Sequence, residues 1–134
     1  MKRVVLDASA VMTFFENRPG ANKVEDLIQL GVAGKRQLSM SVVNWGEVYY
    51  STWRAHGPGV ARKILEDLSQ LPIEIVEADL DLTRTAAELR AEHKLPYTDC
   101  FAAALATHRE ASLATSDHDF AAVEKKIEVL WTTS

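Results

Sequence analysis

Five acidic residues of this chain have the type and the placement that metal-assisted chemistry requires. Asp7 ends the apolar run "KRVVLD", Glu47 follows "SVVNWG", and Asp99 opens the alanine-rich stretch "YTDCFAAALA". Asp117 and Asp119 come directly after "SLATS". Carboxylates that converge on one crevice repel each other, and a divalent cation relieves that repulsion. The pattern therefore indicates a candidate metal site built from oxygen ligands.

The ligand chemistry favours a hard cation. Oxygen ligands without sulfur or imidazole suit Mg²⁺ or Mn²⁺ better than zinc. Cys100 is the only cysteine, which excludes a disulfide within the chain and suits a reducing, cytoplasmic location. The histidines lie far apart and lack metal-ligand spacing: His56, His93, His108 and His118. No Ser-His or Cys-His pairing stands near a predicted strand end, so we expect no side-chain nucleophile.

Most of these acids also have a purely structural interpretation as helix caps. The pattern from Asn44 to Glu47 matches a capping box, and Thr98-Asp99 and Ser116-Asp117 are suitable cap pairs. Asp7 is harder to explain in this way, because an unpaired buried carboxylate at the end of an apolar strand costs stability. Asp79 and Asp81 also follow a predicted strand. Spacing alone therefore does not rank them below Asp117.

The elements that must position these acids alternate between strands and helices. We predict strands at 2–7, 37–43, 73–78, 112–116 and 127–131. We predict helices at 8–17, 21–35, 44–56, 60–71, 79–95, 97–111 and 117–126. This alternation favours an α/β fold with a central, mainly parallel β-sheet of about five strands flanked by helices. In such sheets ligands bind at the carboxyl ends of the strands, which is where the acids fall.

Length and charge set broad limits on function. The 134 residues predict a single domain over 1–134. Fifteen basic and nineteen acidic residues give a net charge of −4, and the basic residues form no run, so composition alone does not indicate a nucleic-acid-binding protein. A cluster of active-site acids would lower the total without excluding that function. The N-terminal apolar run is interrupted by Asp7, and we expect neither a signal peptide nor a membrane span.

Four motifs occur together and in order: "VVLDASAVMTFF", "SVVNWGEV", "LPYTDCFAAALA" and "LATSDHDF". In this order and spacing the chain resembles the PIN-domain ribonucleases, and most closely the VapC toxins of bacterial toxin–antitoxin pairs. The resemblance covers essentially the whole chain. It implies one PIN-like domain that acts as an Mg²⁺- or Mn²⁺-dependent endoribonuclease. It also implies an RNA substrate, products with a 5′-phosphate and a 3′-hydroxyl, a homodimer and a cognate antitoxin.

The resemblance assigns roles residue by residue. The acidic quartet of the family is matched by Asp7, Glu47, Asp99 and Asp117. Asp119 matches a position that sometimes assists the metal. The supporting hydroxyl positions are matched by Ser9, Thr115 and Ser116. Asp79 and Asp81 are left as acids that begin a helix, which separates them from Asp117 where spacing did not.

Candidate contact surfaces follow from the neighbourhood of the motifs. The candidate cations for holding an RNA backbone are Arg18, Arg54 and Lys94. Aromatic side chains beside site residues, which could stack a base, are Trp45, Tyr49 and Tyr97. The apolar segments 11–20 and 45–53 are where we expect a groove for an antitoxin helix. Ordinary surface charges and core packing remain the alternative for each of them.

Other functions stay open at this point. A phosphatase of the haloacid dehalogenase type also begins with a strand that ends in Asp, but it requires a second acid where this chain has Ser9. A binding module for RNA or a protein partner could keep the fold with an inactive site. An RNA-processing PIN nuclease would need no antitoxin. The sequence identifies neither the RNA nor the number of metal ions.

Overall fold

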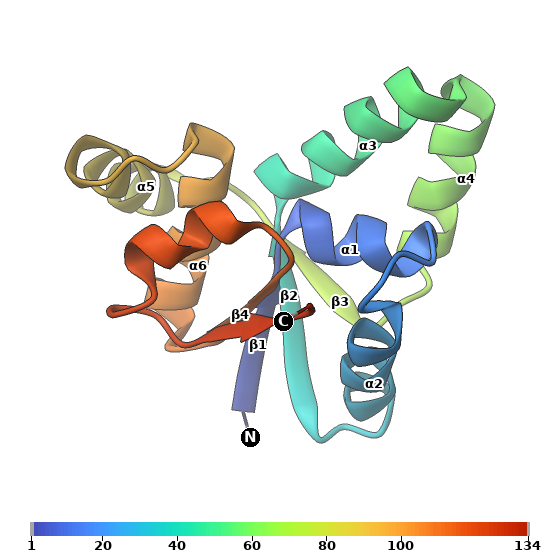
Figure 1. Ribbon diagram of the computed structural model, residues 1–134, viewed down its shortest axis with the longest axis horizontal. Helices are drawn as coiled ribbons and strands as arrows, with labels where there is room; N and C mark the ends of the chain where they lie inside the picture. Colours follow the sequence, from blue (N-terminus) through green and yellow to red (C-terminus); the bar gives the residue numbers. More distant parts are fainter. Residues whose placement is uncertain (1, 134) are drawn as a thin grey trace.

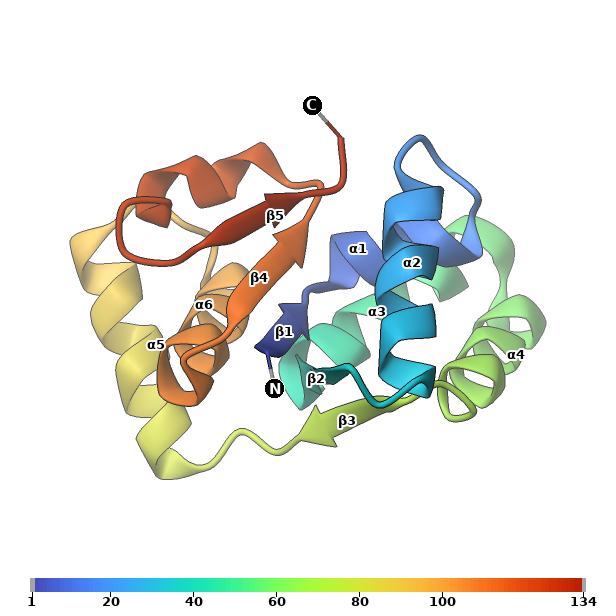
Figure 2. The same cartoon turned by 90° about the horizontal axis from the view of Figure 1, so that it is seen from below.

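A five-stranded parallel sheet forms the centre of the molecule. The computed structural model describes residues 2–133, and the strands follow the order β3-β2-β1-β4-β5. All four strand pairings are parallel, which confirms the predicted α/β class (Figure 2). The strand bounds are β1 Lys2–Leu6, β2 Arg36–Ser41, β3 Ile73–Val76, β4 Ser112–Thr115 and β5 Val129–Trp131.

Helices cover both faces of this sheet (Figure 1). The α-helices are α1 Ala8–Phe15, α2 Ala21–Val32, α3 Val42–His56, α4 Pro58–Leu68, α5 Leu80–Glu92 and α6 Tyr97–Arg109. A 3-10 helix, η1, spans His118–Val123. One apolar cluster joins the sheet to α5 and α6, and the other joins it to α1 and α2. Within residues 2–133, no helix combines the length and the apolar character needed to cross a bilayer.

The second half of strand β1, residues 4–6, is continuously apolar because both of its faces are covered. Val5 packs in the cluster with α5 and α6, whereas Val4 and Leu6 pack in the cluster with α1 and α2. Successive side chains point to opposite faces, and both faces are covered, so every position in the strand's second half is buried. The strand runs toward the edge at which α1 begins, and this brings Asp7 to the carboxyl edge of the sheet.

The boundary between β2 and α3 differs from the prediction. The strand ends at Ser41 rather than at residue 43, and the helix begins at Val42. The Ser41 hydroxyl accepts a hydrogen bond from the Val43 N–H at 3.2 Å and caps the helix. Asn44 therefore does not begin a capping box, and Glu47 lies in the second helical turn instead of the first. The two valines are β-branched, which suggested a strand, but the cap at Ser41 starts the helix before them.

The prediction also placed some helix ends incorrectly. Helix α5 stops at Glu92, three residues before the expected end, and α6 begins at Tyr97 after Pro96 without a side-chain cap. Asp99 is the third residue of α6, so the cap pair proposed for Thr98 and Asp99 is wrong. The last predicted helix, 117–126, is the shorter 3-10 helix η1, and Asp117 caps it as expected.

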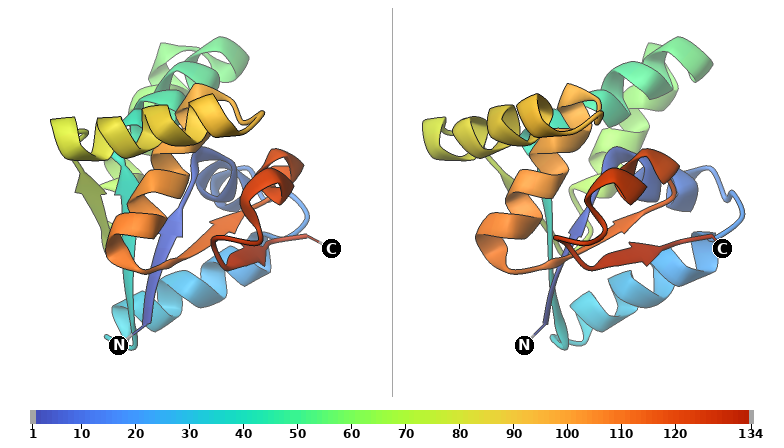
Figure 3. Two further views of the ribbon diagram at one scale, coloured as in Figure 1. Left: turned by 90° about the vertical axis from the view of Figure 1, so that its left-hand side faces the viewer. Right: turned by 60° about the vertical axis from the view of Figure 1, so that its left-hand side comes forward.

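Helices α3 and α4 form an antiparallel hairpin that extends away from the sheet (Figure 1). Gly57 ends α3, and Pro58 occupies the first position of α4. The side views show this hairpin standing beyond the carboxyl edge of β1 and β2 (Figure 3). Helix α3 thus carries residues from the edge of the sheet, near Asn44, out to an exposed tip near His56.

Candidate active site

Asp7 connects the central strand to the first helix. Its carboxylate is 2% exposed, and Oδ1 accepts a hydrogen bond from the Ala10 N–H at 2.9 Å, which caps α1. The Ser9 hydroxyl donates to the same carboxylate, 2.8 Å from Oδ1 and 3.0 Å from Oδ2. The buried charge expected at this position is therefore not isolated, because two neighbours on its own segment donate hydrogen bonds to it.

Thr115 joins the ends of β1 and β4. Its hydroxyl donates to Asp7 Oδ2 at 2.6 Å and accepts from the Asp117 N–H at 2.9 Å. The Ser116 N–H donates to Ser9 Oγ at 3.0 Å. The supporting residues named from the sequence thus form one network, although Ser116 contributes its backbone and not its hydroxyl. The network fixes Asp7 and Asp117 relative to each other across two adjacent strands.

Three carboxylates gather at the ends of β4 and α6. Asp99, Asp117 and Asp119 each offer an oxygen, and these oxygens lie within 4.8 Å of one another. Asp117 Oδ1 accepts from the Asp119 N–H at 2.9 Å, which sets the turn between them. Asp99 is 5% exposed, and its buried Oδ2 has no hydrogen-bond partner within the described residues 2–133. An unpartnered buried carboxylate oxygen beside two other acids fits a divalent cation with oxygen ligands.

Glu47 reaches the same region from α3. The buried Asn44 amide donates to Glu47 Oε1 at 3.4 Å and to the Thr98 carbonyl at 3.0 Å. Asn44 therefore ties α3 to the first turn of α6, immediately before Asp99. Sequence reasoning missed this role because it treated Asn44 as a cap of its own helix. The structure reveals this role through the complete burial of Asn44, one helical turn before Glu47.

Burial and neighbouring carboxylates raise the pKa of three acids in this region, Asp7, Glu47 and Asp99. Burial, the nearby Asp117 carboxylate and the charges of Asp7 and Glu47 raise the pKa of Asp99 to about 8. Burial raises the pKa of Asp7 to about 6, although hydrogen bonds from Thr115, Ala10 and Ser9 oppose the shift. Burial and Asp117 also raise the pKa of Glu47. The charges of all three other quartet acids act on the Asp99 carboxyl, so the structure brings the predicted quartet close enough to interact electrostatically.

The acids that spacing left unranked lie elsewhere. Asp79 caps α5, with Oδ1 accepting from the Leu82 N–H at 2.9 Å. Asp81 is exposed in the first turn of the same helix. Both are helix-start acids, as the family resemblance implied.

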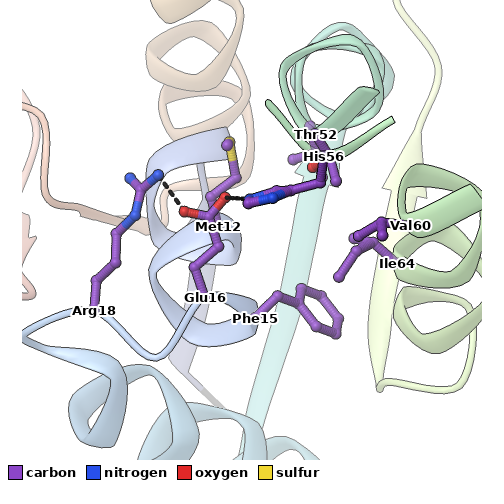
Figure 4. Close-up of a pocket in the computed structure, with 9 residues that line it drawn as sticks. Met12, Phe15, Glu16, Arg18, Thr52, His56, Val60 and Ile64 are labelled. Atoms are coloured by element: carbon purple, nitrogen blue, oxygen red, sulfur yellow. Dashed lines mark ion pairs between the residues drawn. The ribbon is translucent and has the colours of Figure 1, made fainter. Parts of the chain in front are cut away.

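The two segments expected to form a groove do meet at one. A cavity of about 490 Å³ lies between α1, α3 and α4 (Figure 4). Its apolar lining residues are Met12, Phe15, Val48, Val60 and Ile64. At its polar margin Glu16 pairs with Arg18 and lies 3.9 Å from His56 Nε2. Arg18, one of the cations considered for RNA, is therefore already paired in this groove.

The aromatic candidates separate in the structure. Trp45 is half-buried against the cluster shared with α1 and α2. Tyr49 packs edge-on against Trp53, with ring centres 5.7 Å apart. Tyr97 is 47% exposed at the start of α6, two residues before Asp99. Of these three side chains, only Tyr97 is openly accessible beside the acids.

Comparison with solved structures shows the same fold in toxin–antitoxin proteins. A toxin–antitoxin complex from Klebsiella pneumoniae is 22% identical, with a TM-score of 0.70 and 98% of each chain covered. VapBC2 from Rickettsia felis, bound to a DNA fragment from its promoter, is 17% identical, with a TM-score of 0.77, 96% of this chain and 97% of that one. VapC20 from Mycobacterium tuberculosis, a sarcin–ricin loop cleaving toxin, is 14% identical, with a TM-score of 0.70, 92% of this chain and 95% of that one.

Comparison at the level of sequence families is equally direct. No curated protein matches the chain. The family described as "PIN domain" matches residues 4–126, which includes all four motifs and every acid of the predicted quartet. The single-domain extent of 1–134 stays a prediction around that core. On the match, the parallel sheet and the shared fold, this chain belongs to the PIN-domain family.

Proposed function

We propose that the chain is a divalent-metal-dependent endoribonuclease and the toxin of a type II toxin–antitoxin pair. The observation that carries the proposal is the buried Oδ2 of Asp99, which has no hydrogen-bond partner in the described part of the chain, 2–133, and lies among carboxylates at the carboxyl edge of the sheet. Membership of the PIN family supports a nuclease, and the toxin–antitoxin neighbours support the toxin role. The proposed location is the cytoplasm, where the free Cys100 thiol stays reduced.

The quartet is the proposed ligand set for Mg²⁺ or Mn²⁺: Asp7, Glu47, Asp99 and Asp117, with Asp119 assisting. Bound there, the cation supplies an activated water and charge neutralisation at the scissile phosphate. The chain's own part is positioning. Thr115 and Ser9 hold the Asp7 carboxylate through hydrogen bonds, and Asn44 orients Glu47. Water adds to phosphorus and the bond to the 3′ oxygen breaks, which leaves a 5′-phosphate and a 3′-hydroxyl.

The groove between α1, α3 and α4 is the proposed seat of the antitoxin. Its apolar walls suit the apolar face of an amphipathic helix. The groove shares α1 and α3 with the acid cluster, since α1 follows Asp7 and α3 carries Glu47. A basic side chain that extends from the bound helix into the cluster would replace the cation and block the site. A homodimer remains part of the proposal and is checked by the mass of the purified protein in solution.

The test is cleavage of mixed cellular RNA with Mg²⁺ or Mn²⁺ and with EDTA. We expect metal-dependent cuts that are lost in Asp7→Asn and Asp99→Asn. Asp79→Asn is the matched control, because it removes an equivalent carboxylate that only caps α5. Mapping of the cut ends checks the 5′-phosphate. Cleavage that persists in both site variants, or no cleavage by antitoxin-free wild type, would leave an inactive binding module as the better hypothesis.

A further inference from the structure

Two exposed aromatic side chains on the α3–α4 hairpin are each covered by an arginine. Tyr50 is 47% exposed, and the guanidinium carbon of Arg54 lies 5.2 Å from its ring centre. Trp53 is 43% exposed, and the guanidinium carbon of Arg62, from α4, lies 5.7 Å from its ring centre. We call these four residues the aromatic–arginine arm. Large exposed aromatic rings stabilise the folded chain little, so their exposure suggests a binding role.

The arm continues directly from the acid cluster. Glu47, Tyr50 and Arg54 have the spacing i, i+3 and i+7, so they lie along one stripe of α3. At the helical rise of 1.5 Å per residue, Arg54 is about 10 Å along the helix from Glu47. A strand of nucleic acid that leaves the cluster along α3 therefore meets Tyr50 first and Arg54 next.

The charge of this region opposes that of the whole molecule. The chain carries −4 overall, yet residues 48–65 contain three basic residues and no acid. Lys63 pairs with Asp67 at 2.9 Å. Within residues 2–133, neither Arg54 nor Arg62 forms an ion pair with a carboxylate, so both guanidinium groups keep their charge available for a phosphate.

The arm itself offers a second copy of the chain no complementary charge, because residues 48–65 contain no acid. In a two-fold contact its arginines would have to meet acids from another part of the partner. RNA offers the opposite charge, and its bases stack on aromatic rings and on guanidinium planes.

We propose that the aromatic–arginine arm is a subsite for single-stranded RNA beside the scissile bond. A base stacks on the pair formed by Tyr50 and Arg54, and the Arg54 guanidinium also contacts the adjoining phosphate. Trp53 and Arg62 repeat this arrangement for the next nucleotides along the hairpin. The proposal rests on the proposed nuclease function, and it identifies where the flank of the substrate binds rather than where it is cut.

The test measures binding apart from cleavage. A fluorescently labelled single-stranded RNA is titrated with the full chain in EDTA at low salt, followed by anisotropy. Tyr50→Ala is expected to weaken binding at least about fivefold, the effect of losing one stacked base, whereas Tyr50→Phe retains it. Arg54→Ala is expected to lower the slope of log affinity against log salt by about 0.7, one phosphate contact. Arg84→Ala, an exposed arginine on α5, is the control and leaves affinity and slope unchanged.

Cleavage kinetics supply the second readout. With metal, both arm variants are expected to raise KM for long RNA and leave kcat near the wild-type value. If the wild type shows no metal-dependent cleavage, the nuclease proposal fails, while weaker RNA binding by Tyr50→Ala and Arg54→Ala would still support the arm as an RNA-binding surface. The subsite is overturned if wild-type RNA binding is absent, or equal in Tyr50→Ala and Arg54→Ala. It is also overturned if these variants dissociate a wild-type dimer, because the arm would then be a contact between copies.

Discussion

Asp99 is buried, which disfavours the ionised carboxylate that its proposed role as a metal ligand requires. Its carboxyl is nearly inaccessible, and its Oδ2 lacks a partner within residues 2–133. The other quartet acids favour its protonated form. A site that keeps an acid neutral in this way stores free energy that a divalent cation recovers on binding, because the cation replaces the proton as the positive partner.

The metal-free protein should therefore lose stability as pH rises. The pKa of Asp99 is raised from 3.8 to about 8 in the folded chain, so the folded state binds the proton more tightly than the unfolded chain does. Its contribution is fully present below about pH 4 and is lost as pH rises toward 8. In EDTA, the free energy of unfolding of Asp99→Asn minus that of the wild type should increase from about pH 5 to about pH 8. This increase is the expected gain. Urea titrations at the two pH values measure this difference, and a gain that is absent or reversed contradicts it.

At the scale of elements, helix α3 shows both the reach and the limit of sequence reasoning. The motif "SVVNWGEV" placed Glu47 near the acid cluster correctly, because a helix that follows a parallel strand starts at the carboxyl edge. It did not locate the start of the helix, since Val42 and Val43 suit a strand and a serine cap is decided by local geometry. The link from Asn44 to Thr98 joins residues 54 positions apart, and no local pattern encodes it.

That link predicts a specific phenotype for Asn44. Asn44→Ala removes the side-chain hydrogen bond to the Thr98 carbonyl, at a cost of about 0.5–1.5 kcal/mol in stability, and frees Glu47. Asn44→Asp should be worse, since it adds a negative charge beside Glu47. Both variants are expected to weaken Mn²⁺ binding in calorimetric titrations. Ser41→Ala is the matched control on the same helix: it removes the cap, costs about 1 kcal/mol in stability and keeps the metal affinity. Equal loss of metal affinity in both would reduce Asn44 to a stabilising residue.

At the scale of the whole molecule, strand order creates the site. The sheet places β1 beside β4, so Asp7 and Asp117 become neighbours although more than a hundred residues separate them. The alternating pattern predicted a parallel sheet and hence one shared edge for the acids. The order of the strands and the Thr115 bridge between their ends come from tertiary packing, which periodicity does not describe. The family resemblance, not periodicity, chose Asp117 over Asp79.

Substitution of Thr115 tests whether its hydroxyl bridge between Asp7 and Asp117 organises the site. Thr115→Val keeps the shape of the side chain but removes the donor to Asp7 and the acceptor for the Asp117 N–H. We expect a loss of about 1–3 kcal/mol in the free energy of unfolding and a smaller rise in melting temperature on adding Mn²⁺. Thr115→Ser, which keeps the hydroxyl, should restore the metal-induced rise. A Thr115→Val protein that responds to Mn²⁺ as the wild type does would show that the bridge does not organise the site.

Helix α3 carries two different faces, one for each of the two proposed partners. Val48, Thr52 and His56 line the groove, while Glu47, Tyr50 and Arg54 follow the stripe that leads away from the acids. Any energetic coupling between these faces is reciprocal. If a peptide in the groove lowers the affinity for RNA by some factor, bound RNA lowers the affinity for the peptide by the same factor. Release from inhibition would then depend on the supply of substrate as well as on the loss of the inhibitor, so the abundance of target RNA would set the threshold at which the chain becomes active.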